Sequence, residues 1–494
     1  MDEMTFTYQT RLQLDERGCA ILGAYAELAN LVEHALYAEV AKGNSSASCK
    51  NDFLKRFGTT ARQFNGYRIS LEGKIAARRA GQEQALKNLK QQIAVLDKQI
   101  ERLAKKSSKR FVRHQKNRRK IKFSHRLSQL ESDFKENRVR LCFGGKKLFR
   151  AQFYLEQNGF DSHEEWLKAW KEKRNSEFFV LGSKDEASGN QTCKACLKED
   201  GSLSLRLRLP KALEQKYGKY LECDNVTFAY GHATILASLN DPEGQAISYR
   251  FKKDAKGWRV FASTSLEKAA PISLEGIGVI GIDLNTDHLA CVETDRFGNL
   301  IEKKIFPWNS YGKTKEQQKA AIGQLSKQII EWAVQVKKPV VLEKLEFQKK
   351  KMALREESGS QFSRLLSSFA YNQFFLTIQA RGYRQGIAVH QVNPAYTSVI
   401  GHINYTKRYG LSLHLAAALC IARRYQKLSE SPNLSEGEIP DGKGGHVAFV
   451  LPARNRTEHV WRFWGQVKKK LKTVLAAHRR AVKYRSSGPP NRPP

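Results

Sequence analysis

From Gly276 onward, short apolar strands and amphipathic helices follow one another in an order that few folds accommodate. GVIGID (278–283) is an apolar run, and LACVETD (289–295) and NLIEKKIF (299–306) are two further strands joined by a hairpin turn signal. The sequence then predicts helix, buried strand, helix, strand and helix, in turn over 314–336, 339–345, 361–382, 387–393 and 411–428. This alternation predicts an α/β domain.

Three antiparallel strands followed by this alternation are typical of a ribonuclease-H-like domain, and two of the strands end in a carboxylate. Asp283 ends GVIGID and Glu343 ends VVLE. A buried charge is costly unless it is paired or bound to metal. Carboxylates on adjacent strands could share two Mg²⁺ or Mn²⁺ ions and so support in-line phosphodiester displacement. In the alternative interpretation, Asp283 caps a turn and Glu343 forms a surface ion pair with a lysine.

Residues 74–134 have a different, strongly basic pattern. Between Lys74 and Arg126 there are 18 Lys and Arg against 3 Asp and Glu. An apolar seam with a period of 3.5 residues predicts two long helices in an antiparallel pair with a basic tip; it comprises Leu86, Leu89, Ile93, Leu96, Ile100 and Leu103. Such a charge run can be a solvated helix face, but this excess favours contact with nucleic acid. The candidate contact residues are Lys105, Lys106, Arg110, Arg113, Arg118, Arg119 and Lys120.

Alternating apolar and polar residues predict a small, mostly antiparallel β-barrel beside these helices. Its expected strands are 138–143, 203–209, 226–239 and two within 246–266, with a helical insert over 150–180. Arg206 and Arg208 occupy outward positions of one strand and would make that face cationic. An apolar stripe from Val460 to Val474 predicts a C-terminal helix, and SSGPPNRPP (486–494) should be disordered.

Composition limits the partners of the chain. The 494 residues carry a formal net charge of +36, so a polyanion such as nucleic acid is the expected partner. The hydrophobic share of 41% is enough to build real cores. We expect a cytoplasmic, nucleoid-associated protein without a membrane partner, because no apolar run approaches about 18 residues and the N-terminus lacks a secretory pattern. Eight scattered cysteines do not indicate a disulfide framework.

Several segments together resemble one family. GIDLN followed by a hairpin looks like the first motif of the RuvC nuclease domain in TnpB proteins and the related type V CRISPR effectors. VVLEKL looks like the second motif, VNPAYTS (392–398) resembles the segment before the third, and AAALCIARR (416–424) resembles the helix after it. Where the family usually carries an aspartate in the third motif, this chain has His414, whose neutral imidazole could bind a metal or carry a proton.

The resemblance implies an RNA-guided, Mg²⁺-dependent DNA endonuclease with guide RNA and target DNA as partners. Asp283, Glu343 and His414 would form its catalytic metal site. The family's paired CxxC knuckles are absent, and Cys193 and Cys196 lack a second cysteine pair, so no zinc is expected. The domains implied are a first barrel strand, a helical recognition insert, a wedge-like barrel, a RuvC-type nuclease domain and a basic tail, over 1–17, 18–135, 136–270, 276–430 and 431–494.

Two other functions stay open at this point. The histidine in the third motif allows an RNA-guided DNA-binding protein that does not cut, such as a repressor or a transposition targeting subunit. The second is a structure-specific nuclease that needs no guide. The oligomeric state is also open, because the apolar seam could pair within one chain or between two.

Overall fold

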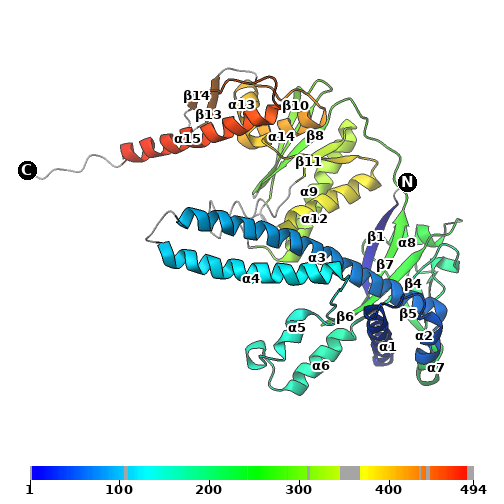
Figure 1. The fold of residues 1–494 in the computed structure, drawn as a ribbon. Helices are drawn as coiled ribbons and strands as arrows, with labels where there is room; N and C mark the ends of the chain where they lie inside the picture. The colour runs from blue at the N-terminus through cyan, green and yellow to red at the C-terminus, as the bar shows by residue number, and fades with distance from the viewer. Residues whose placement is uncertain are drawn as a thin grey trace, which may run out of the picture. The chain divides into compact units, whose positions relative to one another are not determined.

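A computed structural model describes residues 3–104, 109–241, 243–285, 287–308, 312–344, 368–432, 436–440 and 446–486. The chain forms two compact units, Met1–Glu267 and Lys268–Pro494 (Figure 1). It is a mixed α/β, multidomain protein, as predicted. All eight cysteines are free thiols. None of the described helices is both long enough and apolar enough to cross a membrane.

The first unit is built on an open antiparallel sheet in the order β1-β7-β6-β2. Its strands are β1 (Met4–Arg11), β2 (Glu177–Val180), β6 (Ile247–Asp254) and β7 (Gly257–Leu266). Helix α1 (Glu16–Ala41) packs on this sheet, where Tyr25 stacks on Phe178 with 4.1 Å between ring centroids. Phe178 in turn stacks on Phe251 at 4.8 Å. Buried aromatic stacking therefore joins the first helix to two strands that are distant in sequence.

The predicted single barrel is wrong for the described residues, because hydrogen bonding divides its strands between two sheets. The second sheet is antiparallel, in the order β3-β4-β5. Its strands are β3 (Cys193–Leu197), β4 (Leu203–Arg208) and β5 (Tyr220–Val226). On β4 the leucines are buried and Arg206 is exposed, so the predicted alternation of this strand is confirmed.

Two of the predicted barrel strands are also wrong. Residues 138–143 form no regular element, because side chains satisfy their backbone: Gln82 donates to the carbonyl of Arg138, and Tyr37 bridges Val139 and Leu141. The run 226–239 ends its strand at Val226 and continues as helix α8 (His232–Leu239) after Gly231, which has a φ of 74°. The apolar residues of this run after Gly231 therefore lie on a helix rather than on a strand.

The predicted antiparallel pair of basic helices is confirmed in the first unit. Helix α3 (Ala61–Ala104) runs beside α4 (Arg110–Lys135), as Figure 1 shows. Lys90 pairs with Glu131 at 2.9 Å, and Lys120 pairs with Asp97 at 2.6 Å. Residue numbers increase along α3 where they decrease along α4, so the two helices are antiparallel. The remaining elements of this unit are α2 (Lys50–Phe57), α5 (Lys146–Ala151), η2 (Glu156–Asn158), α6 (His163–Arg174), η3 (Ala187–Gly189) and α7 (Lys211–Tyr217).

The second unit is built on a five-stranded mixed sheet in the order β10-β9-β8-β11-β12. The first three strands are antiparallel, and β11 and β12 lie parallel to β8. The predicted strands and helices occur in the predicted order, with one further helix between the last of these strands and the last of these helices. Its elements are β8 (Ile280–Leu284), β9 (His288–Thr294), β10 (Leu300–Pro307), α9 (Lys315–Val336), β11 (Val340–Glu343), α12 (Ser368–Arg384), β12 (Val389–Val392) and α14 (Leu413–Tyr425).

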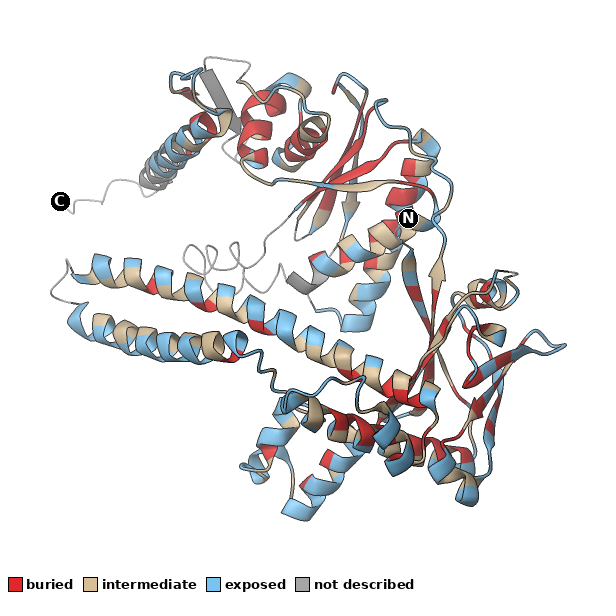
Figure 2. Ribbon diagram, turned by 45° about the vertical axis from the view of Figure 1, so that its right-hand side comes forward, coloured by how far each residue is buried: buried red, intermediate tan, exposed pale blue. Residues whose placement is uncertain are grey.

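Helices cover both faces of this sheet, so its central strands are buried throughout (Figure 2). On β9, Leu289 and Cys291 join the core formed with α9 and α12. Their neighbours Ala290 and Val292 join the opposite core with α13 (Thr397–Tyr409), α14 and α15 (Val460–Ser486). Period-two alternation between two apolar cores explains why these strands read as continuous apolar runs.

The predicted C-terminal stripe is confirmed, because Trp464, Val467 and Leu471 of α15 are buried in this core. Helix α13 is an element that the sequence analysis did not predict, and β13 (Glu436–Pro440) with β14 (His446–Val450) forms a further hairpin. The start of the helix predicted over 361–382, the residues Lys105 and Lys106, and 487–494 of the tail lie outside the described residues.

Candidate active site

Asp283 and Glu343 lie at the same end of two neighbouring parallel strands. Strands β8 and β11 are in register up to the pair Ile282 and Leu342, and each carboxylate is the next residue along its strand. Both side chains are buried, with exposed fractions of 8% for Asp283 and 7% for Glu343. The burial of Glu343 does not fit the surface position considered for it, and whether it pairs with a lysine stays open. Burying two carboxylates at adjacent strand ends costs folding free energy unless neighbouring groups or a cation compensate their charge.

Close packing of α14 against β8 positions this end of the sheet. Gly281 is two residues before Asp283, and a Cβ atom there would overlap the carbonyl oxygen of Ala418 and lie 2.8 Å from the amide nitrogen of Ala422. The run of small residues in AAALCIARR thus lets the helix backbone approach the strand directly. As a result, the first turn of α14 lies beside the end of β8.

This packing brings His414 to Asp283. The Nδ1 atom of His414 lies 3.1 Å from Oδ2 of Asp283. Asn285 donates to the same oxygen at 3.1 Å. The hydrogen bond with Asp283 raises the pKa of His414 above its ordinary value, although partial burial opposes the shift and the charges of Asp283 and Asp287 add to it. The His414 side chain is 42% exposed, so its ring reaches solvent while it contacts the buried acid.

Two hydrogen bonds from other helices hold Glu343. The hydroxyl of Thr397 donates a hydrogen bond to Oε1 of Glu343, and Tyr371 donates to the Glu343 carbonyl oxygen. Both donor residues are buried, so α13 holds the carboxylate of Glu343 and α12 holds its backbone carbonyl. The sequence analysis did not assign Thr397 a role, although its place in VNPAYTS was the available signal. Asn393 in that segment has a turn role, because its Oδ1 accepts a hydrogen bond from the amide of Ala395 at 2.9 Å.

His288 continues the polar contacts at the start of β9. Its ring meets that of His414 edge-on, with 4.9 Å between centroids and 76° between planes. The Nδ1 atom of His288 lies 2.8 Å from Oδ1 of Asp287. The described residues therefore contain a continuous chain of contacts from Asp287 through His288 and His414 to Asp283.

The carboxylate oxygens of Asp283 and Glu343 are suitable ligands for a hard divalent cation, but the described residues do not form a complete ligand set. In the described part of the chain, no group of three or more His, Cys, Asp or Glu side chains is arranged to hold a metal ion. Asp283 uses only Oδ2 in its hydrogen bonds to described residues, which leaves Oδ1 for another ligand. Mg²⁺ commonly takes one or two carboxylates and completes its octahedron with water and substrate phosphate. The pair of acids fits that mode, and the ligand role predicted for His414 stays a prediction.

The candidate nucleic-acid residues occupy two places in the first unit. Arg110, Arg118 and Arg119 are exposed on α4, while Arg113 is half-buried. Lys120 is engaged by Asp97 within the helix pair. On β4, Arg206 lies 3.6 Å from Glu222 and stacks over Tyr220 with 4.0 Å from the guanidinium carbon to the ring centroid. The arginines of α4 are therefore better placed to meet a polyanion than Arg206, whose charge is already partly compensated.

Comparison with known proteins finds similarity in structure only. No family model matches the sequence, and no curated protein matches it. A cryo-EM structure of a Cas12f1–sgRNA–target DNA complex is similar with 13% identity and a TM-score of 0.23, over 85% of this chain and 100% of that one. A CRISPR-Cas12f ternary complex is similar with 12% identity and a TM-score of 0.22, over 87% of this chain and 100% of that one.

A third solved structure, Thermus thermophilus RuvC with a Holliday junction substrate, matches 30% of this chain and 90% of its own at 15% identity, with a TM-score of 0.21. The two Cas12f matches thus span most of this chain, and the RuvC match spans a smaller part of it.

Proposed function

We propose that this chain is an RNA-guided DNA endonuclease of the TnpB and type V CRISPR effector type, with its cutting site in a ribonuclease-H-like second unit. The observation that carries the proposal is the pair of buried carboxylates, Asp283 and Glu343, one residue beyond an in-register contact of parallel strands. No described lysine or arginine forms an ion pair with Asp283. A divalent cation bound between the two acids would compensate their charge.

In this function Asp283 and Glu343 would hold two Mg²⁺ or Mn²⁺ ions, and His414 would complete the site. When bound, the ions would activate the attacking water and stabilise the leaving oxygen of the DNA phosphodiester. Thr397 holds one carboxylate oxygen of Glu343, and His414 with Asn285 holds one oxygen of Asp283. These contacts fix the acids before any cation binds, which lowers the cost of ordering them.

The positive charge of the chain supports nucleic-acid partners. A guide RNA paired with one DNA strand would present an A-form backbone that cationic side chains such as those of α4 can hold. Charge reversal at Arg118 and Arg119 should then lower RNA affinity and flatten its dependence on salt.

The test reconstitutes the full chain with the RNA that copurifies with it and with DNA carrying the matching sequence. Cutting should require both Mg²⁺ and the RNA, and Asp283→Ala should abolish cutting while DNA binding persists. Binding without cutting by the wild-type chain would instead favour a guided binder. Cutting of a four-way junction without RNA would favour the structure-specific nuclease.

A further inference from the structure

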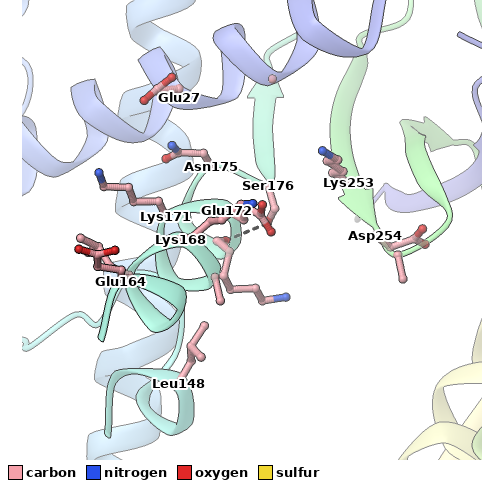
Figure 3. Close-up of a pocket in the computed structure, with 15 residues that line it drawn as sticks. Glu27, Leu148, Glu164, Lys168, Lys171, Glu172, Asn175, Ser176, Lys253 and Asp254 are labelled. Atoms are coloured by element: carbon pink, nitrogen blue, oxygen red, sulfur yellow. Dashed lines mark hydrogen bonds between the residues drawn. The ribbon is translucent and has the colours of Figure 1, made fainter. Parts of the chain in front are cut away.

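The small helical insert of the first unit has two surfaces that the proposed function does not use. One is a cavity of about 860 Å³ between α5, α6, α1 and the turn joining β6 to β7 (Figure 3). Its lining balances four lysines against four acids: Lys168, Lys171, Lys173, Lys253, Glu27, Glu164, Glu172 and Asp254. Balanced charge gives a polyanion no reason to enter this cavity.

The other surface is formed by three solvent-exposed aromatic residues at and just after α5. Phe149, Phe153 and Tyr154, here called the aromatic platform, have exposed fractions of 43%, 67% and 60%. Large exposed rings gathered in one place on a soluble protein usually mark a binding surface. The segment 145–154, GKKLFRAQFY, combines these rings with three cations and no acid.

The platform is held by a small core of its own. Phe149 meets Phe153 edge-on at 6.4 Å and contacts Trp170 at 5.6 Å, and Trp170 stacks on Trp166 at 5.9 Å. Trp166 also donates from Nε1 to the carbonyl of Leu148 at 2.8 Å, which ties α6 to α5. Phe149 is therefore held on buried tryptophans, and Phe153 packs against Phe149, which lowers the conformational freedom that these two rings lose on binding.

Among the described residues, the cations beside the platform have no acidic partner. Lys146, Lys147 and Arg150 form no ion pair with any described residue, and neither do Arg78 of α3 and Arg126 of α4. Burial lowers the pKa of Lys146, and the charges of Arg78, Arg150 and Arg126 lower it further, although the neighbouring Cys142 opposes the shift. Cations gathered from three helices are destabilising by themselves and favourable when a phosphate chain lies among them.

We propose that the aromatic platform binds unpaired nucleotides of a single-stranded nucleic acid, with bases stacked on Phe153 and Tyr154 and phosphates against Lys146, Lys147 and Arg150. A duplex cannot use the platform, because its base faces are already covered by their neighbours. An apolar segment of a partner protein could cover the exposed rings, but it would not neutralise the neighbouring cations. This inference rests on the part of the proposed function that gives the chain an RNA partner, and it does not depend on cutting.

The test measures binding of the full chain to a labelled single-stranded RNA of about 16 nucleotides, to DNA of the same sequence, and to the corresponding RNA duplex. Phe153→Ala with Tyr154→Ala should weaken single-strand binding by about tenfold or more, since one stacked base contributes about 1–3 kcal/mol. Duplex binding should change less than about twofold. Phe153→Trp with Tyr154→Trp should restore affinity, and Phe153→Leu with Tyr154→Leu should not, because leucine keeps apolar area without an aromatic face. A larger loss with RNA than with DNA would identify RNA as the strand.

Tyr230→Ala, at an 85% exposed tyrosine of the same unit, is the matched control. Ultraviolet crosslinking of bound RNA should map to the peptide containing 149–154. If the wild-type chain binds no RNA, the RNA partner of the proposed function fails. If the wild-type chain binds RNA and the double alanine variant binds it equally well, or leucine restores binding, only the platform is overturned.

Discussion

The Thr397 hydroxyl donates a hydrogen bond to Oε1 of Glu343, so a residue of α13 fixes a carboxylate of β11. Neither residue is near the other in sequence, and both are buried, at 2% and 7% exposure. Hydrogen bonds to a buried charge are stronger than those between neutral groups.

Thr397→Val should therefore slow cutting of guided DNA by about tenfold or more, because one charge-assisted hydrogen bond contributes about 1.5–3 kcal/mol. Thr397→Ser keeps the hydroxyl and should retain most of the activity. Single-turnover cutting rates at saturating Mg²⁺ measure the effect, and DNA affinity should stay unchanged. A valine variant that cuts at the wild-type rate would remove Thr397 from the site.

Gly281 should not tolerate a side chain, because α14 occupies the space where its Cβ would lie. Gly281→Ala should lower the free energy of unfolding by about 1–3 kcal/mol through overpacking and shift Asp283 relative to His414. Gly323→Ala in α9 is the matched control, because nothing lies within 4 Å of its Cβ position. That variant should be neutral or more stable by up to about 1 kcal/mol. Urea unfolding of both variants checks the contrast, and equal effects would contradict the close approach.

Lys338 and Glu293 form a buried ion pair, with Nζ and Oε1 2.6 Å apart and side chains 8% and 7% exposed. Lys338 also donates to the carbonyl of Thr294 at 2.8 Å. Lys338→Met should lower the free energy of unfolding by about 3–5 kcal/mol, because it leaves a buried carboxylate unpaired. Adding Glu293→Leu should recover much of the loss. Lys327→Met, which breaks an exposed pair of α9, should leave the unfolding midpoint unchanged.

His402 should make stability depend on pH. Burial lowers its pKa to about 4, and its Nε2 is buried without a described hydrogen-bond partner. In the unfolded state this histidine takes up a proton near pH 6.5, whereas in the folded state it does so only near pH 4. The free energy of unfolding is therefore highest above about pH 6.5 and decreases as the pH falls toward 4. The full shift corresponds to about 3 kcal/mol, and partial exposure of the ring reduces the expected loss to about 1–2 kcal/mol.

His402→Gln should lose less stability than the wild type between pH 6.5 and pH 4, because the side chain no longer titrates. Unfolding midpoints across this range measure the difference. The same substitution at His114, which is exposed on α4, should leave the acid profile unchanged. Parallel pH curves for wild type and His402→Gln would show that another group causes the acid loss.

The sequence predicted most elements of the second unit and failed on part of the first. Strands of the mixed sheet contact apolar cores on both faces, so long apolar runs marked them clearly. In the first unit, local pattern misled, because 226–239 contains apolar residues that suit either a strand or a helix. Residues 138–143 alternate like a strand, yet distant side chains of α1 and α3 satisfy their backbone.

Sequence alone was enough to single out Asp283, Glu343 and His414, because a polar residue at the end of an apolar run and a motif order are local properties. Only the tertiary structure determined that β8 and β11 are neighbours in register, and that His414 contacts Asp283. Only packing brought Thr397 to Glu343, 54 residues away along the chain. Contacts between distant residues depend on strand order and helix packing, which periodicity in a single segment cannot encode.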